Sequence, residues 1–147
     1  MEQEKALKLY VILARAYRSL TQADKQDMRG HGFGTSEFMV LEVLYHRGPQ
    51  AIQQLASKVL LTSGSMTYVV TKLENKKLLR KVVDEQDKRI YYAELTEQGT
   101  ELMHSVIPRH NKFIQEMLAV LTEEEAEMLM KLLKKLGKSV ENYEQEV

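Results

Sequence analysis

The sequence predicts a mainly α-helical protein that carries one small β-hairpin, and three observations lead to this fold class. Apolar residues recur at three- and four-residue steps in several segments, as they do along one face of a helix. Two short runs rich in β-branched and aromatic residues, 79–83 and 90–95, enclose a charged turn. The hairpin follows directly after a helix whose outer face is polar, and this order is typical of a winged helix-turn-helix lobe.

The composition is that of a folded, helix-rich chain of 147 residues, enough for one domain or for two small lobes that share a core. It contains no cysteine, which excludes disulfides, thiolate metal sites and redox sensing through thiols. The charged start at 1–5 leads into an amphipathic helix, and no apolar run suits a signal peptide or a membrane span. We therefore expect a soluble, cytoplasmic protein with no membrane partner.

Charge is unevenly distributed, although the chain has 21 basic and 21 acidic residues. Residues 72–89 hold seven Lys or Arg against four acids, a balance of +3. Residues 122–147 hold seven Glu against four Lys, a balance of −3. The chain is therefore dipolar, and the positive end at the hairpin suits contact with phosphates.

Glycines separate the helices expected in the first half of the chain. An apolar stripe predicts a long helix over 3–29, and the glycines within 30–34 end it. Thr35 is the expected N-cap of a second helix, with the acid Glu37 in its first turn near the positive end of the helix dipole. Gly48-Pro49 ends this second helix.

Two more helices are expected before the hairpin. The third is short and covers about 52–59, and Thr62 is the expected N-cap of the fourth. The inner face of the fourth helix follows the i, i+3, i+4, i+7 pattern and consists of Met66, Val69, Val70 and Leu73.

Two long helices follow the hairpin. Thr96 is the expected cap of a fifth helix that reaches about Leu118, and Pro108 inside it should kink or divide it. Residues 122–125 form a capping box that begins a last helix, whose apolar stripe is as broad as that of the first.

The broad stripes of the first and last helices exceed what a small lobe can bury alone. The expected solution is an isologous homodimer in which the first, fifth and last helices of two chains pack together. This gives a division into dimerisation helices at 1–30 and 100–147 and a winged helix-turn-helix DNA-binding domain at 31–99.

The outer face of the fourth helix carries small hydroxyl residues, a tyrosine and a lysine. Small side chains at its N-terminal end let a helix enter a major groove, where Ser and Thr contact phosphates or base edges. The alternative is an ordinary solvated face, and the wing that follows favours DNA. The predicted groove-facing residues are Ser63, Ser65, Thr67, Tyr68, Thr71 and Lys72.

The turn of the hairpin supplies the other candidate DNA contacts. Asp84 and Asp87 are suitable turn formers, and Lys88 and Arg89 lie at the tip or just past it. An arginine at this position can enter a narrow minor groove, whose negative potential attracts it. The alternative is that Arg89 pairs with Asp87 to brace the turn, and the two roles are compatible.

Several motifs together resemble the MarR family of bacterial transcriptional regulators. They are Leu-Glu-Asn-Lys-Lys-Leu-Leu at 73–79, Asp-Lys-Arg at 87–89 and Leu-Thr-Glu-Gln-Gly at 95–99. The resemblance covers the whole chain and implies a homodimeric cytoplasmic repressor of double-stranded DNA, released by small phenolic or other aromatic ligands or by oxidation. By position, it implies that Arg89 is the minor-groove residue and Asp87 its brace.

Two features depart from the family pattern. Lys77 stands where the family usually has a glycine after the recognition helix, and a left-handed conformation there costs a lysine on the order of 1 kcal/mol. The absence of cysteine removes regulation by thiol oxidation. The pair His31-Gly32 is similar to the branch of the family that responds to quinones and hydroquinones, which implies a quinone-like effector.

An effector is expected where the DNA-binding lobe meets the dimer helices, because a ligand there changes the spacing of the recognition helices. The alternative is that most of the candidate residues belong to the core or to a hinge. The four histidines, at 31, 46, 104 and 110, contain no i, i+4 pair, so we expect no metal site, and no cofactor. The effector candidates are Tyr10, Tyr17, His31, Phe33, Phe38 and Tyr45.

The sequence lacks the parts of an enzyme, namely a nucleophile with its base, paired carboxylates or a glycine-rich phosphate loop. We expect a DNA-binding transcriptional regulator, a homodimeric repressor that binds an inverted-repeat operator and is released by a small aromatic ligand. Two alternatives stay open. One is an activator of the same fold, since the position of the operator sets the sign of regulation. The other is a winged-helix protein-interaction module, which would favour an apolar or acidic outer face on the fourth helix.

Overall fold

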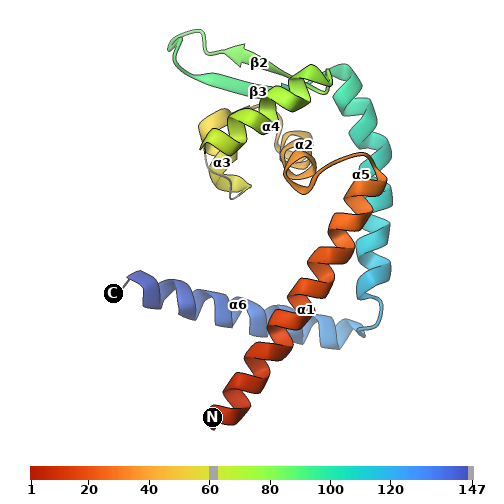
Figure 1. Cartoon of the computed structure of the whole chain (residues 1–147), viewed down its shortest axis with the longest axis vertical. Coiled ribbons are helices and arrows are strands. Elements are labelled where there is room, and N and C mark those ends of the chain that lie inside the picture. The colour runs from red at the N-terminus through yellow and green to blue at the C-terminus, as the bar shows by residue number, and fades with distance from the viewer. Residues whose placement is uncertain (60–62, 146–147) are drawn as a thin grey trace. The chain divides into compact units, whose positions relative to one another are not determined.

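The protein folds into helices with one small antiparallel sheet, as the sequence predicted (Figure 1). The structure is a computed structural model that describes residues 1–59 and 63–145. Its elements in chain order are α1 (Gln3–Gly30), α2 (Thr35–Arg47), β1 (Gln50–Ala51), α3 (Ile52–Lys58), α4 (Ser63–Asn75), β2 (Leu79–Val83), β3 (Tyr91–Leu95), α5 (Glu97–Leu118) and α6 (Glu123–Gln145).

The sheet has three strands in the described part of the chain, in the order β1-β3-β2, where the sequence predicted two. The predicted hairpin is present as β2 and β3, which pair antiparallel from Leu79 opposite Leu95 to Val83 opposite Tyr91. The strand that was not predicted, β1, is two residues long and pairs with β3. A segment this short shows no alternation of polar and apolar residues, so only the tertiary partner identifies it as a strand.

The core lies where α2, α3, α4 and α5 meet the sheet. Phe38, Leu41, Leu55 and Met103 are each at most 1 % exposed. The predicted inner face of α4 is confirmed, because all four of its apolar residues are at most 7 % exposed. Burial of these apolar side chains is the main force that holds the elements together, because each Å² of apolar surface removed from water stabilises the fold by about 25 cal/mol.

The chain divides into two compact units, Met1–Asn111 and Lys112–Val147. The first contains the winged helix-turn-helix elements together with α1, and the second contains α6. The division into dimerisation and DNA-binding parts stays a prediction. None of the helices in the described ranges is long and apolar enough to cross a membrane.

The helix caps differ in part from the predicted ones. Thr35 is the first residue of α2 rather than its N-cap, and Gly34 occupies the cap position in an extended conformation. Glycine has no side chain to cap with, so Glu37 accepts the N–H of Gly34 at 3.3 Å instead. Thr62, the predicted cap of α4, lies outside the described residues.

The caps of the last two helices are as predicted. The Thr96 hydroxyl accepts the N–H of Gly99 at 3.0 Å. Thr122 and Glu125 form the reciprocal capping box, with bonds of 3.3 Å and 2.9 Å. Pro108 does not divide α5, which continues as one helix from Glu97 to Leu118. The proline removes one backbone donor, and a helix of this length retains enough other bonds to continue past it.

The end of α4 explains the departure at Lys77. Lys77 has a φ of 59°, the left-handed conformation that ends many helices. The N–H of Leu78 donates to the carbonyl of Leu73 at 3.0 Å, and the N–H of Lys77 donates to that of Glu74 at 2.9 Å. This is the hydrogen-bond pattern of a Schellman motif, which glycine adopts with less strain than lysine.

We expect Lys77→Gly to raise the free energy of unfolding by about 1 kcal/mol, because it relieves a left-handed lysine. The Lys77 side chain is exposed, so its removal breaks no buried contact. Urea denaturation of both proteins measures the difference. An unchanged or lower midpoint in the variant would contradict the argument.

The Leu-Thr-x-x-Gly motif fastens this turn to the start of α5. The Thr96 hydroxyl donates to the carbonyl of Lys77 at 2.6 Å, and the N–H of Thr96 donates to that of Leu78 at 3.1 Å. A Cβ on Gly99 would lie 1.9 Å from the Leu78 carbonyl oxygen, a distance no side chain permits. The motif therefore fixes where α4 ends relative to the start of α5.

Candidate nucleic-acid interface

The outer face of α4 carries the residues that the sequence selected. Ser65, Thr67 and Thr71 are exposed, and Tyr68 is 68 % exposed although it is a large aromatic residue. Lys72 is exposed two turns further along the helix than Ser65. The side chain of Ser63 lies outside the described part of the structure. An exposed aromatic ring among small hydroxyl residues gives this face chemistry that suits the edges of bases.

Backbone hydrogen bonds shape the tip of the wing. Oδ1 of Asp84 accepts the N–H of Gln86 at 2.9 Å and of Asp87 at 2.8 Å. The N–H of Asp84 donates to the carbonyl of Ile90 at 2.9 Å, which closes the loop. Asp84 is thus one of the two turn formers that the sequence predicted, and Asp87, the other, accepts the N–H of Arg89 at 3.0 Å.

The pairing of Arg89 with Asp87, suggested by the sequence, is present. Nε and Nη2 of Arg89 each donate to a different Asp87 oxygen at 3.0 Å. The side-chain bond from Arg89 holds the pKa of Asp87 below its usual value, and the carboxylate raises the pKa of Arg89. The Arg89 side chain is nevertheless 90 % exposed. Asp87 therefore orients a guanidinium that remains available to a partner.

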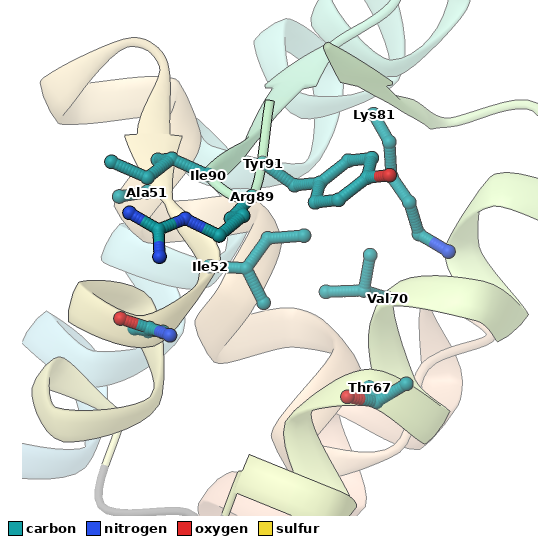
Figure 2. Close-up of a pocket in the computed structure, with 9 residues that line it drawn as sticks. Ala51, Ile52, Thr67, Val70, Lys81, Arg89, Ile90 and Tyr91 are labelled. Atoms are coloured by element: carbon teal, nitrogen blue, oxygen red, sulfur yellow. The ribbon is translucent and has the colours of Figure 1, made fainter. Parts of the chain in front are cut away.

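The wing and the recognition helix share a hollow of about 420 Å³ (Figure 2). Thr67 from α4 and Arg89 from the wing both line it, although they are 22 positions apart in the sequence. Ile52 and Tyr91 supply part of its apolar surface. Sequence reasoning missed these two residues, because nothing in their local pattern marks them as neighbours of the candidate DNA contacts.

A second hollow, of about 660 Å³, lies beside the other half of the same helix face. Ser65, Tyr68 and Lys72 line it, together with Lys25 of α1. Lys25 was not predicted, because it belongs to a helix remote in sequence from α4. The structure thus adds a second cationic side chain to the hollow that Lys72 lines.

Glu37 also lines this hollow, and its side chain is only 4 % exposed. Its carboxylate is 2.5 Å from Nζ of Lys72 and 3.0 Å from Nζ of Lys76. Burial alone would raise the pKa of Glu37, but the hydrogen bonds from the two lysines and from the Gly34 N–H outweigh it, so the pKa lies below its usual value. The sequence identified Glu37 only as an acid in the first turn of the second helix and did not predict its pairing with the two lysines.

The lowered pKa predicts how Glu37→Gln changes stability with pH. Because the folded pKa is depressed, the ionised carboxylate contributes stability above the ordinary glutamate pKa of about 4.3, and this is lost as the pH falls through the folded value. At pH 7 we expect the free energy of unfolding of the glutamine variant to be about 1 to 2 kcal/mol lower than that of the unaltered protein. Denaturation across pH 3–7 should show the two proteins converging in acid, and a constant difference would contradict the assignment.

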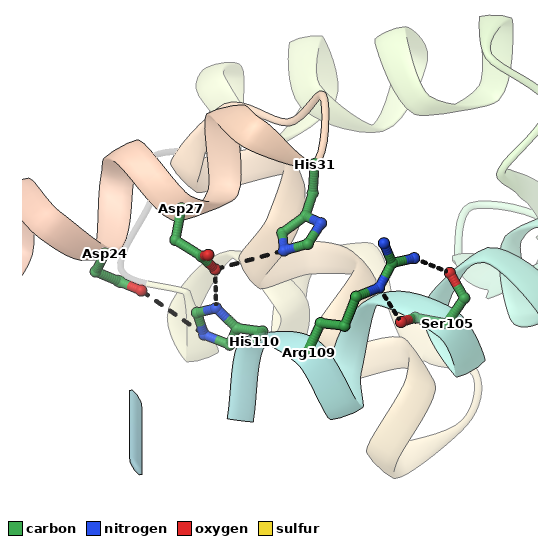
Figure 3. A network of polar contacts seen from close by, with 6 residues as sticks. All are labelled: Asp24, Asp27, His31, Ser105, Arg109 and His110. Carbon is green, nitrogen blue, oxygen red and sulfur yellow. Dashed lines mark hydrogen bonds and ion pairs between the residues drawn. The ribbon is translucent and has the colours of Figure 1, made fainter. Parts of the chain in front are cut away.

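A polar cluster connects α1 to α5 within the first unit (Figure 3). His110, buried on α5, has Nδ1 2.9 Å from Oδ2 of Asp27 and Nε2 3.7 Å from Oδ1 of Asp24. His31 Nε2 is 3.6 Å from the same Asp27 oxygen. Burial raises the pKa of Asp24, opposed by His110 and assisted by Asp27. His31, an effector candidate, thus already contacts an aspartate.

The other effector candidates lie in different surroundings. Phe33 and Phe38 are 4 % and 1 % exposed and belong to the core. The centroid of the Phe38 ring lies 4.6 Å from the centroid of the His110 ring. Tyr10 and Tyr17 are exposed on α1, by 71 % and 69 %.

Tyr45 lines a hollow of about 490 Å³ between α2, β3 and α5. A hydrogen bond of 2.8 Å joins its hydroxyl to Nδ1 of His104. Of the residues the structure describes, no group of three or more His, Cys, Asp or Glu side chains is arranged to hold a metal ion.

An exposed polar recognition helix and a wing that presents a braced arginine define a winged helix-turn-helix protein that binds DNA. Comparison with known proteins gives the family. A sequence profile of the MarR family matches residues 35–91. The chain is also 45% identical, over 140 residues, to the HTH-type transcriptional regulator MhqR of Bacillus subtilis (strain 168), an alignment that covers 95% of this chain and 97% of MhqR. The chain belongs to the MarR family of DNA-binding transcriptional regulators, and it is not an enzyme.

Solved structures share the fold. Sco3205 from Streptomyces coelicolor, a MarR family transcriptional regulator solved in complex with DNA, matches with a TM-score of 0.85 and 19% identity over 95% of this chain and 89% of its own. NadR, solved in complex with 4-hydroxyphenylacetate, matches with a TM-score of 0.71 and 22% identity over 88% of this chain and 92% of its own.

Proposed function

We propose that the protein is a homodimeric, cytoplasmic repressor that binds an inverted-repeat operator in double-stranded DNA. The observation that carries this proposal is the wing arginine, fixed by Asp87 and 90 % exposed, next to the polar face of α4. In this proposal Ser63, Ser65, Thr67, Tyr68, Thr71 and Lys72 face the major groove, and Asp87, Lys88 and Arg89 form the wing contact.

Dimerisation is supported by unpartnered apolar surface on the terminal helices. On α6, Leu129, Leu133, Leu136 and Val140 are 42–51 % exposed in the single chain. On α1, Leu7 and Ile12 are 60 % and 55 % exposed. Apolar stripes of this length mark an interaction surface, and a second copy of the chain presents a self-complementary partner.

Selection of bound DNA from genomic fragments tests the proposal. Two symmetry-related recognition helices must enter successive major grooves, so the half-site centres should lie about 10 base pairs apart. Footprinting should then show an inverted repeat protected by one dimer. A single asymmetric site occupied by a monomer would contradict it.

Transcription from a reporter that carries the selected operator then separates repression from activation. Deletion of the regulator should raise transcription if the protein is a repressor. Lower transcription after deletion would identify an activator of the same fold. Failure to select any DNA would instead favour the protein-interaction module.

We further propose that a small phenolic or quinone-like molecule releases the DNA. NadR binds such a phenol, 4-hydroxyphenylacetate. Here Tyr45 and His104 present a hydroxyl and an imidazole at one hollow, groups suited to hydrogen-bond a phenol or a quinone oxygen. Tyr10, Tyr17 and His31 would contact the effector together with Tyr45 or in the dimer, whereas Phe33 and Phe38 belong to the core.

Fluorescence anisotropy of labelled operator measures release by a series of phenols, hydroquinones and quinones. Release is expected without any oxidant, because the chain has no cysteine to oxidise. Release that occurs only with peroxide and follows methionine sulfoxide formation would show that the ligand proposal is wrong.

A further inference from the structure

Lys72 is a predicted DNA contact that already has a protein partner. Its ammonium and that of Lys76, one turn later on α4, both meet the carboxylate of Glu37, which belongs to α2. The three residues thus join the recognition helix to the first turn of α2. A buried carboxylate at this junction must be paired, because an unpaired charge there would be strongly destabilising.

The two lysines are not equivalent. Lys76 donates a hydrogen bond to Oε2 of Glu37, and its Nζ lies 5.8 Å from the centroid of the Phe33 ring, so two groups hold it. Lys72 is the more exposed of the two, 47 % against 38 %, and it lines the hollow beside Ser65 and Tyr68.

The charges of the cluster leave a surplus. One carboxylate and two ammonium groups sum to +1, so Lys76 can neutralise Glu37 by itself while Lys72 contacts an anion. A DNA phosphate at the hollow would meet Lys72 directly, and Lys25 lines the same hollow.

We propose that Glu37 is a positioning residue for DNA recognition: it holds Lys72 at the edge of the groove and fixes the orientation of α4, so that Lys72 meets a backbone phosphate in one register. The inference rests on the proposed operator binding and adds a residue that does not itself touch DNA. Phosphate contacts of this kind set the register in which base contacts form. Glu37 therefore acts on the preference for the operator more than on affinity for DNA in general.

The test compares affinity for the selected operator with affinity for an unrelated duplex of equal length. Glu37→Gln should lower the ratio of the two affinities by about tenfold. Affinity for the unrelated duplex should be unchanged or higher, because a negative charge near the phosphates is removed. A purely structural role would lower both affinities by the same factor and leave the ratio unchanged, and that result would overturn the proposal.

A double-mutant cycle shows whether Glu37 acts through Lys72. In a Lys72→Met background, Glu37→Gln should have no further effect on the ratio. Full additivity of the two losses would overturn the proposal. Glu74→Gln is the matched control, since Glu74 of α4 pairs with Lys81 at 3.1 Å and is 39 % exposed. It should leave the ratio unchanged, and a loss equal to that of Glu37→Gln would count against a specific role for Glu37.

A second variant keeps the test decisive if Glu37→Gln does not fold. Lys76→Met changes a partly exposed residue and leaves Lys72 as the remaining ammonium on Glu37. Lys72 should then stay paired with the Glu37 carboxylate and no longer contact a phosphate. The salt slope of operator binding should therefore fall by about 0.9 for each protomer, or about 1.8 for the dimer. Lys72→Met should lower the slope by the same amount. An unchanged slope in Lys76→Met would overturn the proposal. Selective operator binding by the unaltered protein is measured first, and its absence would refute the proposed function instead.

Discussion

Arg89→Ala is expected to weaken binding of the dimer to its operator by about tenfold or more, with the fold and the dimer intact. The side chain is 90 % exposed and its bonds are to Asp87 alone within the described residues, so its removal opens no cavity. The proposed dimer presents two wings, and both would lose a guanidinium that Asp87 holds in place. An arginine in a narrow minor groove is attracted by the enhanced negative potential there, and an arginine at a phosphate contributes through the release of counterions.

The salt dependence of binding distinguishes two ways in which Arg89 can act. If it neutralises a phosphate, the dimer loses two contacts and the salt slope should shrink by about 1.8, with similar losses on every sequence. If it reads the width of the minor groove, the loss should be greatest on operators with A·T-rich flanks.

Lys88→Ala is the matched control for Arg89, because Lys88 is its exposed neighbour and no bond holds its side chain among the described contacts. Lys88→Ala should weaken DNA binding less than Arg89→Ala does, and by the same factor on every DNA sequence. Circular dichroism and sedimentation establish that both variants are folded dimers. Operator affinity that is unchanged in Arg89→Ala at moderate salt would refute the wing assignment and favour the protein-interaction module.

Removal of residues 122–147 is expected to abolish dimerisation and reduce operator affinity by several orders of magnitude. The segment contains all of α6, with its exposed leucines and Val140. Without it, each winged helix-turn-helix lobe binds one half-site, and the second lobe no longer gains from the proximity of the first. Sedimentation velocity and DNA titration measure the two losses.

A point substitution controls for misfolding of the truncated chain. Leu133→Glu places a charge on the apolar stripe of α6 at a residue already 42 % exposed, so the single chain should fold and the dimer should not form. Lys135→Glu places the same charge on the same helix at a residue that is already charged, and it should leave the dimer intact. A truncated chain that stays folded and soluble and binds the operator tightly would show that α6 is dispensable.

Much of the fold follows from local sequence patterns. The buried face of α4, the hairpin and the capping box at Thr122 were predicted because each depends on residues within a few positions of one another. The Arg89–Asp87 pair was identified for the same reason, because two residues with one residue between them can pair within a single turn. Lys77 was singled out because the family usually has glycine there, and its φ of 59° shows that the lysine adopts the left-handed conformation.

The tertiary structure alone decided which distant residues meet. Glu37 and Lys72 lie 35 positions apart, and only the packing of α2 on α4 brings their charges to 2.5 Å. His110 reaches Asp27 across 83 positions, and β1 is a strand only because β3 lies beside it. Helix periodicity reports which face of an element is buried, but it does not report what that face is buried against. The sequence by itself therefore determined the six helices, the hairpin wing and the class of partner, whereas the third strand and the ion pairs between α2 and α4 depend on contacts formed only when the core assembles.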